Sequence, residues 1–224
     1  MGATHTVIIA DDHPLFRAAL KGTLASLMSD CDIIEASDIN SLQVAVESHP
    51  DADLILLDLH MPGAHGFSGL IHLSSHHCEI PVAVISAHET PEIMRRALDH
   101  GAAGFLPKSS SVAIIGEAID AILAGNIWLP EGIDANQVSS NHDEIALANV
   151  LATLTPQQFR VASMLAEGLL NKQIAYEMNV TEATIKAHIT EVYKKLSVQS
   201  RTQAVLVMSQ LNVLPPNNSD NLSA

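Results

Sequence analysis

Cysteine is scarce in this 224-residue chain, and the two cysteines present, Cys31 and Cys78, do not have the spacing of a metal site. A disulfide framework and a cysteine-based zinc module are therefore excluded. Histidines gather beside Cys78 at positions His72, His76 and His77. A solvated helix end explains this group better than zinc does, and we place no metal there.

Long apolar runs are also missing. Apolar residues make up 47% of the chain, but no run approaches the roughly 18 residues of a membrane span. The opening stretch MGATHTVIIADD has no basic region, and its apolar run ends at Asp11 and Asp12, which argues against a signal peptide. We expect a soluble protein that stays in the cytoplasm.

Basic residues are few, and they are unevenly placed. The chain has 11 lysines and arginines against 25 aspartates and glutamates. Residues 1–148 carry 5 of the basic groups and 20 of the acidic ones, a net charge of −15, whereas residues 149–224 carry 6 against 5. The N-terminal part is thereby excluded as a binder of polyanions, while the C-terminal part can approach one without strong repulsion.

What the N-terminal half does contain is a regular alternation of strands and helices. Between residue 4 and about residue 124, segments of helical length separate five β-rich runs, HTVIIA, CDIIEA, DLILLD, PVAVIS and AGFLP. Such alternation is typical of a parallel sheet, and the near-continuous apolarity indicates strands covered on both faces. We predict a flavodoxin-like, doubly wound α/β domain with a five-stranded parallel sheet, and the chain length leaves room for a second, smaller domain.

Polar side chains stand where the expected strands end. Asp11 and Asp12 follow the first strand, and Asp58 ends the third, so their carboxylates converge at the switch point of the sheet. Three such carboxylates repel one another unless a divalent cation lies among them, and oxygen ligands suit Mg²⁺. Ser86 and Lys108 end the fourth and fifth strands. Together these five side chains predict a site for chemistry on a phosphoryl group.

This constellation resembles the receiver domain of two-component response regulators. The matching pieces are DDHP, LLDLHMPG, VISA and GAAGFLPK. The resemblance implies that Asp58 accepts a phosphoryl group from a histidine kinase. It also implies that Asp12, Asp58 and the backbone carbonyl of His60 coordinate Mg²⁺, with Asp11 acting through water.

The same resemblance assigns roles around the phosphoryl group. It implies that Ser86 and Lys108 contact the phosphoryl oxygens. Phe105 is either a rotameric switch, as in the family, or an ordinary packed strand residue. One departure concerns the backbone, because many receivers place proline directly after the lysine, whereas here Pro107 precedes it and Ser109 follows it.

The C-terminal part shows helix-capping signals instead. Residues 125–150 do not continue the alternation of strands and helices, and we interpret them as a linker. The second half of this linker is either helical or irregular. Beyond it, capping residues predict four helices that begin at Thr155, Asn171, Thr181 and Ser200.

The third of these helices has one apolar stripe and one basic face. The stripe consists of Ile185, Ile189, Val192 and Leu196, and the opposite face shows Ala183, Lys186, Ala187, Thr190 and Lys194. Small residues between lysines allow a helix to enter the major groove of double-stranded DNA. A plain solvated face is the alternative for a lone helix.

The order of the helices resembles the LuxR-type helix-turn-helix domain over residues 151–211. The matching pieces are LTPQQ, EGLLNKQIA, TEATIKAHI, KKL and SRTQA. The resemblance implies base contacts from Lys186, Ala187 and Thr190, although Thr190 replaces a basic residue found in several relatives. It implies phosphate contacts from Lys172, Lys194, Lys195 and Arg201.

A receiver followed by this small all-α domain is the arrangement of the NarL/FixJ class of response regulators. The expected division is a receiver over 1–124, a linker over 125–150, the DNA-binding domain over 151–211 and a disordered tail over 212–224. The implied function is a phosphorylation-controlled transcriptional regulator that binds operator DNA as a homodimer.

The charge difference suggests how the two ends communicate. We expect a docked receiver to silence DNA binding by repulsion and by covering Lys186 and Thr190. Phosphorylation then releases the C-terminal domain, whose fourth helix, with Val205 and Met208, pairs with a second copy.

Two other functions are considered. Haloacid dehalogenase-like phosphatases also use an aspartyl phosphate, Mg²⁺ and a lysine, but they generally need a second aspartate two residues after the nucleophile. His60 occupies that position here, which argues against turnover. The other alternative is a regulator that acts through protein contacts without DNA, which the small positive charge of the C-terminal part leaves open.

Overall fold

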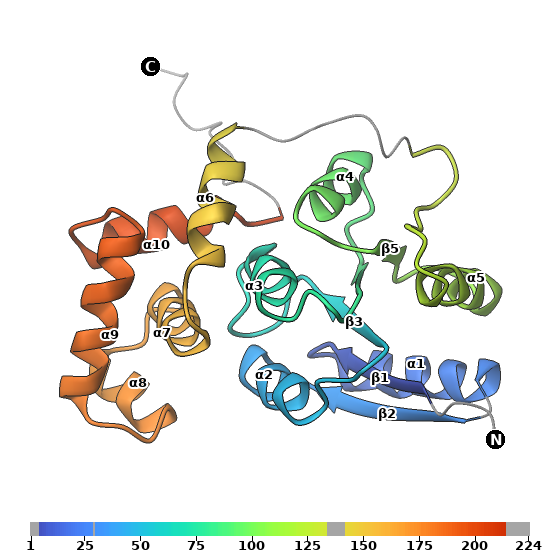
Figure 1. Cartoon of the computed structure of the whole chain (residues 1–224), viewed down its shortest axis with the longest axis horizontal. Helices are drawn as coiled ribbons and strands as arrows, with labels where there is room; N and C mark the ends of the chain where they lie inside the picture. The colour runs from blue at the N-terminus through green and yellow to red at the C-terminus, as the bar shows by residue number, and fades with distance from the viewer. Residues whose placement is uncertain (1–4, 29, 134–141, 214–224) are drawn as a thin grey trace, which may run out of the picture.

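The structure, a computed structural model of the chain, describes residues 5–28, 30–133 and 142–213. An α/β domain comes first and a helical domain second (Figure 1). The strands are β1 (His5–Ala10), β2 (Cys31–Ala36), β3 (Leu54–Asp58), β4 (Val82–Ser86) and β5 (Gly104–Pro107). They form a parallel sheet in the order β2-β1-β3-β4-β5, which confirms the predicted flavodoxin-like arrangement.

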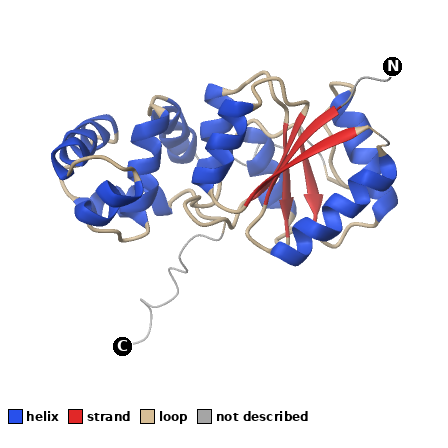
Figure 2. Cartoon of the chain, turned by 90° about the horizontal axis from the view of Figure 1, so that it is seen from below, coloured by secondary structure: helices blue, strands red, loops and turns tan. Residues whose placement is uncertain are grey.

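Helices cover both faces of this sheet (Figure 2). They are α1 (Pro14–Leu27), α2 (Ile39–Ser48), α3 (Ser68–His76), α4 (Pro91–Asp99) and α5 (Val112–Leu123). Side chains alternate along each strand, so in β1 Val7 and Ile9 pack with α1 and α5, while Ile8 and Ala10 pack with α2, α3 and α4. These two buried layers fix the strand ends, where the predicted site residues lie.

The chain after α5 first returns to the sheet. Trp128 forms an isolated parallel bridge with Gly104 at the edge of β5. The Trp128 N–H donates to the Ala103 carbonyl and the Trp128 carbonyl accepts from the Phe105 N–H, both at 3.1 Å. Further along, α6 (His142–Ala152) shows that the second half of the predicted linker is helical.

The helical domain follows the predicted order. Its helices are α7 (Pro156–Ala166), α8 (Asn171–Glu177), α9 (Glu182–Lys195) and α10 (Arg201–Ser209). Thr155, Thr181 and Ser200 cap helices as predicted, because each side chain accepts a hydrogen bond from the backbone N–H three residues on. The second helix begins after Leu170, so Asn171 is its first residue and not its cap.

The two domains pack against each other along a surface that we call the joint. It joins α2, α3, α4 and the loop 61–67 of the α/β domain to α6, α7 and residues 211–213, which follow α10. The Phe67 N–H donates to the Leu211 carbonyl at 3.0 Å, and Arg160 Nε donates to Asn40 Oδ1 at 2.7 Å. One buried core therefore continues from the α/β domain into the helical domain.

The sequence predicts a disordered tail from residue 212, and the structure differs at its start. Val213 is only 3% exposed, and Arg96 donates to the carbonyls of Val213 and Asn212 at 3.1 and 3.2 Å. Gly66, at φ +56°, allows this close approach, because a Cβ there would overlap the Leu211 carbonyl oxygen. The remainder of the predicted tail lies outside the described residues.

The histidines at the end of α3 also differ from the expected solvated helix end. His76 is exposed, but His72 is 4% exposed because α7 covers it in the joint. Nothing local in the sequence distinguishes the two residues, since the helix that buries His72 comes more than 80 positions later.

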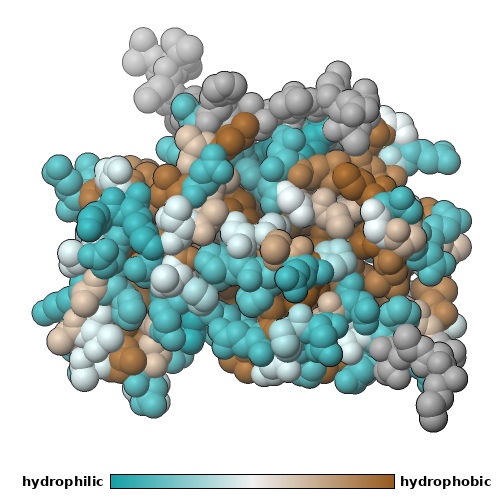
Figure 3. Space-filling model, in the orientation of Figure 1, coloured by the Kyte–Doolittle hydropathy of each residue, from teal (hydrophilic) through white to brown (hydrophobic). Residues whose placement is uncertain are grey.

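Hydrophilic side chains predominate on the face drawn in Figure 3, and they continue across the line where the two domains meet. Exposed large apolar side chains, such as Leu15, Tyr176 and Leu206, are spread over α1, α8 and α10. Among the helices in the described ranges, none has the length and apolar character needed to cross a membrane.

Candidate functional site

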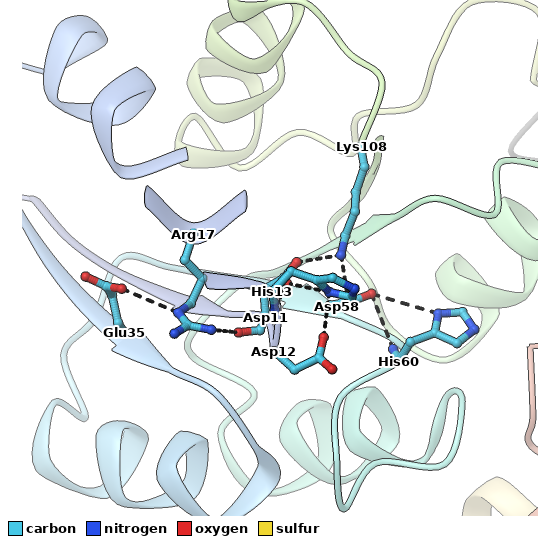
Figure 4. Close-up of polar contacts among 8 residues, drawn as sticks. All are labelled: Asp11, Asp12, His13, Arg17, Glu35, Asp58, His60 and Lys108. Atoms are coloured by element: carbon cyan, nitrogen blue, oxygen red, sulfur yellow. Dashed lines mark hydrogen bonds and ion pairs between the residues drawn. The ribbon is translucent and has the colours of Figure 1, made fainter. Parts of the chain in front are cut away.

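The structure brings the predicted acidic residues together at the carboxyl ends of β1 and β3. Asp11 and Asp58 are each only 2% exposed. Lys108, just after β5, places its Nζ 2.6 Å from Asp11 Oδ2 and 2.8 Å from Asp58 Oδ2 (Figure 4). The parallel topology causes this convergence, because these three strands end at the same edge of the sheet.

Lys108 is held in its charged form. Burial by itself lowers the pKa of Lys108, but the hydrogen bonds and the charges of Asp11 and Asp58 outweigh burial and raise the pKa above its usual value. The ring of Phe16 lies beneath the ammonium group, with its centroid 4.8 Å from Nζ. A fixed cation is thus available beside the Asp58 carboxylate.

Asp12 and His13 extend the acidic group toward solvent. His13 Nδ1 lies 2.6 Å from Asp12 Oδ1 and 3.2 Å from Asp11 Oδ1. Ligand atoms of Asp11, Asp12, His13 and Asp58 all lie within 4.8 Å of one another. Three carboxylates face one lysine here, so their hard oxygen donors and excess negative charge fit a bound Mg²⁺.

Sequence reasoning missed two residues of this group. His13 is one, and its signal was its place directly after the acidic pair in DDHP. Arg17, one turn into α1, is the other. Its Nη1 donates to the Asp11 carbonyl at 2.5 Å and its Nε pairs with Glu35 at 3.4 Å (Figure 4). Arg17 thereby fixes the backbone that carries the acidic pair.

His60 follows Asp58 by two residues, and Ser86 ends the neighbouring strand β4. The His60 N–H donates to Asp58 Oδ1 at 3.3 Å. Ser86 is fully buried, its hydroxyl accepts the His88 N–H at 3.1 Å, and its carbonyl accepts the Lys108 N–H at 2.8 Å. The structure therefore brings both predicted strand-end residues, Ser86 and Lys108, to the same edge as Asp58.

Two imidazoles border this edge. The rings of His60 and His88 lie with their centroids 4.8 Å apart. Burial lowers the pKa of His60, and the charges of His88 and Lys108 add to this effect, while the charges of Asp58 and Asp12 oppose it. The His60 ring lies close to the Asp58 carboxylate, with Nδ1 3.9 Å from Asp58 Oδ1.

Phe105 lies on β5, three residues before Lys108. Its ring is fully buried in the core beneath α4, and its backbone N–H is bonded to Trp128. The structure thus shows Phe105 packed inward in the strand.

The helix-turn-helix presents its predicted face to solvent. Lys172, Lys186, Ala187, Thr190 and Lys194 are all exposed, and Ile185, Ile189 and Val192 are buried on the opposite side of α9. The Thr190 hydroxyl donates to the Lys186 carbonyl at 2.9 Å, within its own helix.

Two predicted phosphate contacts have partners inside the domain. Lys195 Nζ donates to the Thr153 carbonyl at 2.6 Å and to Gln158 Oε1 at 2.7 Å. Arg201 Nη2 donates to the carbonyls of Leu165 and Leu169 at 3.0 and 2.7 Å. Both side chains stabilise the packing around α7.

The expectation that a docked receiver covers Lys186 and Thr190 is wrong. The α/β domain packs on α6, α7 and residues 211–213, and α9 lies on the far side of the helical domain (Figure 1). The predicted pairing face of α10 is also corrected. Met208 is 1% exposed because it packs into the core, whereas Leu206 is 60% exposed.

Comparisons with known proteins agree with both halves of the chain. The response regulator receiver domain matches residues 7–120, and the luxR family of bacterial regulatory proteins matches residues 152–208. The glycerol metabolism activator of Pseudomonas putida is 40% identical over 207 residues, 90% of this chain and 94% of that protein. The chain belongs to the NarL/FixJ class of response regulators.

Other proteins are similar to this chain in sequence or in fold. The nitrate/nitrite response regulator protein NarL of Escherichia coli is 30% identical over 92% of this response regulator and 95% of NarL. A solved RcsB response regulator of Salmonella typhimurium has a TM-score of 0.54 at 22% identity, covering 92% of this chain and 98% of its own. A LuxR family DNA-binding response regulator from Silicibacter pomeroyi has a TM-score of 0.51 at 35% identity, covering 57% of this chain and 98% of its own.

Family membership decides between the functions considered from the sequence. The chain is a DNA-binding transcriptional response regulator and not a phosphatase of the dehalogenase type. Its acidic group, with Asp11, Asp12 and Asp58, corresponds to the pocket in which receiver domains generally bind Mg²⁺.

Proposed function

We propose that this response regulator accepts one phosphoryl group on Asp58 from a histidine kinase. The observation that carries the proposal is the Lys108 ammonium held between the buried carboxylates of Asp11 and Asp58. Asp58 ends the central strand, so its carboxylate oxygen is the nucleophile that attacks the phosphorus atom. The leaving group is the imidazole of the kinase.

Each neighbour of Asp58 then has a role. Asp12, Asp58 and the His60 carbonyl would hold Mg²⁺, with Asp11 acting through water, and the ion supplies positive charge to the transferring group. Lys108 adds a second positive charge from a side chain that is already in place. The Ser86 hydroxyl contacts a phosphoryl oxygen.

The chemistry at Asp58 is confined to the regulator itself. It consists of phosphorylation and of later hydrolysis of the same group, without turnover of a separate substrate. His60 stands where a phosphatase would carry its second aspartate. Phe105, whose strand ends directly before Lys108, is the switch residue that changes its packing when the phosphoryl group arrives.

The output of the regulator is operator binding. We propose base contacts from Lys186, Ala187 and Thr190 in the major groove, and phosphate contacts from Lys172 and Lys194. Lys195 and Arg201 support the domain through the internal bonds described above. Without phosphorylation, electrostatic repulsion between DNA and residues 1–148, whose net charge is −15, suppresses operator binding. Steric covering has no part in this, because the DNA-contact face of α9 is exposed.

Pairing of two chains accompanies phosphorylation in this proposal. Solved RcsB structures include dimers bound to DNA, which supports a homodimer as the active form. The proposed parts are a receiver over 1–124, a linker over 125–150 and the DNA-binding domain over 151–211. Exposed Leu206 on α10 replaces Met208 as the apolar contact between copies.

Substituting Lys186 with alanine tests the DNA contact. We expect operator binding to weaken by about 1–3 kcal/mol, roughly 5- to 150-fold, because Lys186 contacts the bases and carries charge. Binding is measured with and without acetyl phosphate at one fixed salt concentration. Lys21→Ala, which removes a lysine from α1 in the α/β domain, should bind as the wild type does. Equal affinity of Lys186→Ala and wild type would contradict the proposed face.

The lifetime of the phosphoryl group depends on His60 and His88. Their rings border the edge of the sheet next to Asp58, so we expect them to crowd the path of the attacking water and to slow hydrolysis. His60→Ala and His88→Ala should each lose the phosphoryl group severalfold faster than the wild type. Decay of the labelled protein after removal of the donor gives the rates. Longer retention in both variants would show that the imidazoles promote hydrolysis instead.

A further inference from the structure

A histidine is buried in the joint between the two domains. His72 of α3 stacks on Phe159 of α7 with ring centroids 4.2 Å apart and planes 3° from parallel. His72 is 4% exposed and Phe159 is fully buried, although they belong to different domains. The ring of His76 lies 4.3 Å from the ring of His72. The His72 imidazole is therefore enclosed only while the domains are docked.

Neither ring nitrogen of His72 has a hydrogen-bond partner among the groups that the structure describes. The hydroxyl of Ser163, one turn beyond Phe159 on α7, is likewise buried and unpartnered within the same described ranges. Unpaired polar atoms oppose burial, and a charged imidazole would oppose it far more than a neutral one. Docking therefore selects the neutral form of His72.

The charges around His72 offer no compensation. Burial lowers the pKa of His72 to about 3, and the neighbouring imidazoles of His76 and His77 add to the shift. The nearby charged groups bond to other residues. Glu144 of α6 pairs with Arg96 of α4 and with His100, which follows α4, and Arg160 of α7 bonds to Asn40. Glu47 of α2 acts on His77 and accepts a hydrogen bond from Gln43.

We propose that His72 makes the docking of the two domains sensitive to acid, so that protons open the joint without phosphorylation of Asp58. In the docked state the imidazole must be neutral, whereas in the open state it meets water and takes up a proton at its ordinary value of about 6.5. The stabilisation of docking by a neutral His72 is fully present above that value and is lost as the pH falls through it. The signal in this proposal is protonation of His72 in the joint, which is a different site from the acidic group at Asp58.

The expected change in the opening equilibrium depends only on the ordinary pKa of His72 in the open state. Between pH 7.5 and pH 5.5 the opening equilibrium should rise about tenfold, because the open state is stabilised by one proton that the docked state excludes. Two other histidines of the joint differ from His72 because each has an oxygen partner. His100 Nε2 lies 2.7 Å from Glu144 Oε1, and His65 Nε2 lies 3.4 Å from the Ser163 carbonyl oxygen.

Amide hydrogen exchange of the full-length, unphosphorylated protein tests the proposal. The Phe67 N–H bonds to the Leu211 carbonyl across the joint, so its exchange, corrected for the intrinsic rate at each pH, reports the opening equilibrium. We expect opening at Phe67 to increase about tenfold from pH 7.5 to pH 5.5 in the wild type. The Ile55 N–H, bonded to Pro81 within the sheet, should show no such increase.

Matched variants assign the effect to His72. His72→Phe keeps a ring to stack on Phe159 and His72→Leu keeps an apolar group of smaller size, and neither takes up a proton, so both should lose the pH dependence. His5→Phe, which removes a histidine from the start of β1, should behave as the wild type does. Opening that stays constant with pH in the wild type would overturn the proposal, and so would an equal rise in both His72 variants. Imidazole resonances of the wild type give a further check, because protonation of His72 while the joint stays closed would also overturn it.

Discussion

Asp58→Asn is expected to abolish phosphorylation of this response regulator. The wild type, given acetyl phosphate and Mg²⁺, should take up one phosphoryl group per chain, and the variant should take up none. The reason is geometric, because Asp58 is the carboxylate that ends the central strand and lies 2.8 Å from the Lys108 ammonium. Asparagine preserves the shape but has no anionic oxygen to attack phosphorus.

Intact mass spectrometry measures this uptake directly. Asp51→Asn, at an exposed position before β3, is the matched control and should be labelled as fully as the wild type. Removal of Mg²⁺ with a chelator should prevent labelling of the wild type too, because the excess negative charge of Asp11, Asp12 and Asp58 would repel the phosphoryl donor. Full labelling of Asp58→Asn would disprove the assignment of the phosphoacceptor.

Arg96→Ala is expected to separate the two domains without unfolding either. Arg96 is 6% exposed, and its guanidinium pairs with Glu144 at 2.9 Å, donates to the carbonyls of Asn212 and Val213, and lies 4.6 Å from the Phe67 ring centroid. Alanine removes the donor to two carbonyls and leaves the largely buried Glu144 carboxylate with His100 in place of two cationic partners. Breaking a buried pair in this way costs about 3 kcal/mol, or more than a hundredfold in the docking equilibrium.

Exchange of the Phe67 amide is the measurement for this variant as well. Its protection should fall more than a hundredfold in Arg96→Ala, while amides in the sheet, such as that of Ile55, keep theirs. Lys21→Ala again serves as the control for loss of one positive charge. Gly66→Ala tests the same joint by a different route, because its Cβ would overlap the Leu211 carbonyl oxygen. Unchanged protection of Phe67 in Arg96→Ala would show that the joint does not depend on this side chain.

The strands and the acidic site could be predicted because their signals are local. An apolar run that ends in Asp58 predicts both a buried strand and a charged side chain at the end of that strand. The parallel topology then brings Asp11 and Lys108 to the same edge of the sheet. The starts of three helices in the second domain could also be predicted, because Thr155, Thr181 and Ser200 are typical N-cap residues.

The joint could not be predicted because its contacts pair residues far apart in the chain. The sequence places His72 in a polar helix end, and only the structure shows that Phe159 stacks on it. The sequence likewise predicts that Asn212 and Val213 begin a tail, whereas the structure shows that Arg96 bonds to both of their carbonyls. The same limit applies to the bonds of Arg201. The family resemblance implied a DNA phosphate contact, and only the folded helical domain shows the carbonyls of Leu165 and Leu169 to which Arg201 donates.

Because Trp128 is attached to the edge of β5, the intrinsic fluorescence of the regulator reports on this edge of the sheet. Trp128 is the one tryptophan in the sequence, so all indole emission of the protein comes from a single point. That point is bonded to the backbone of Phe105, on the strand that leads to Lys108. A change in emission on adding a phosphodonor therefore originates at this edge of the receiver, with no dye attached and no contribution from the indole of another segment.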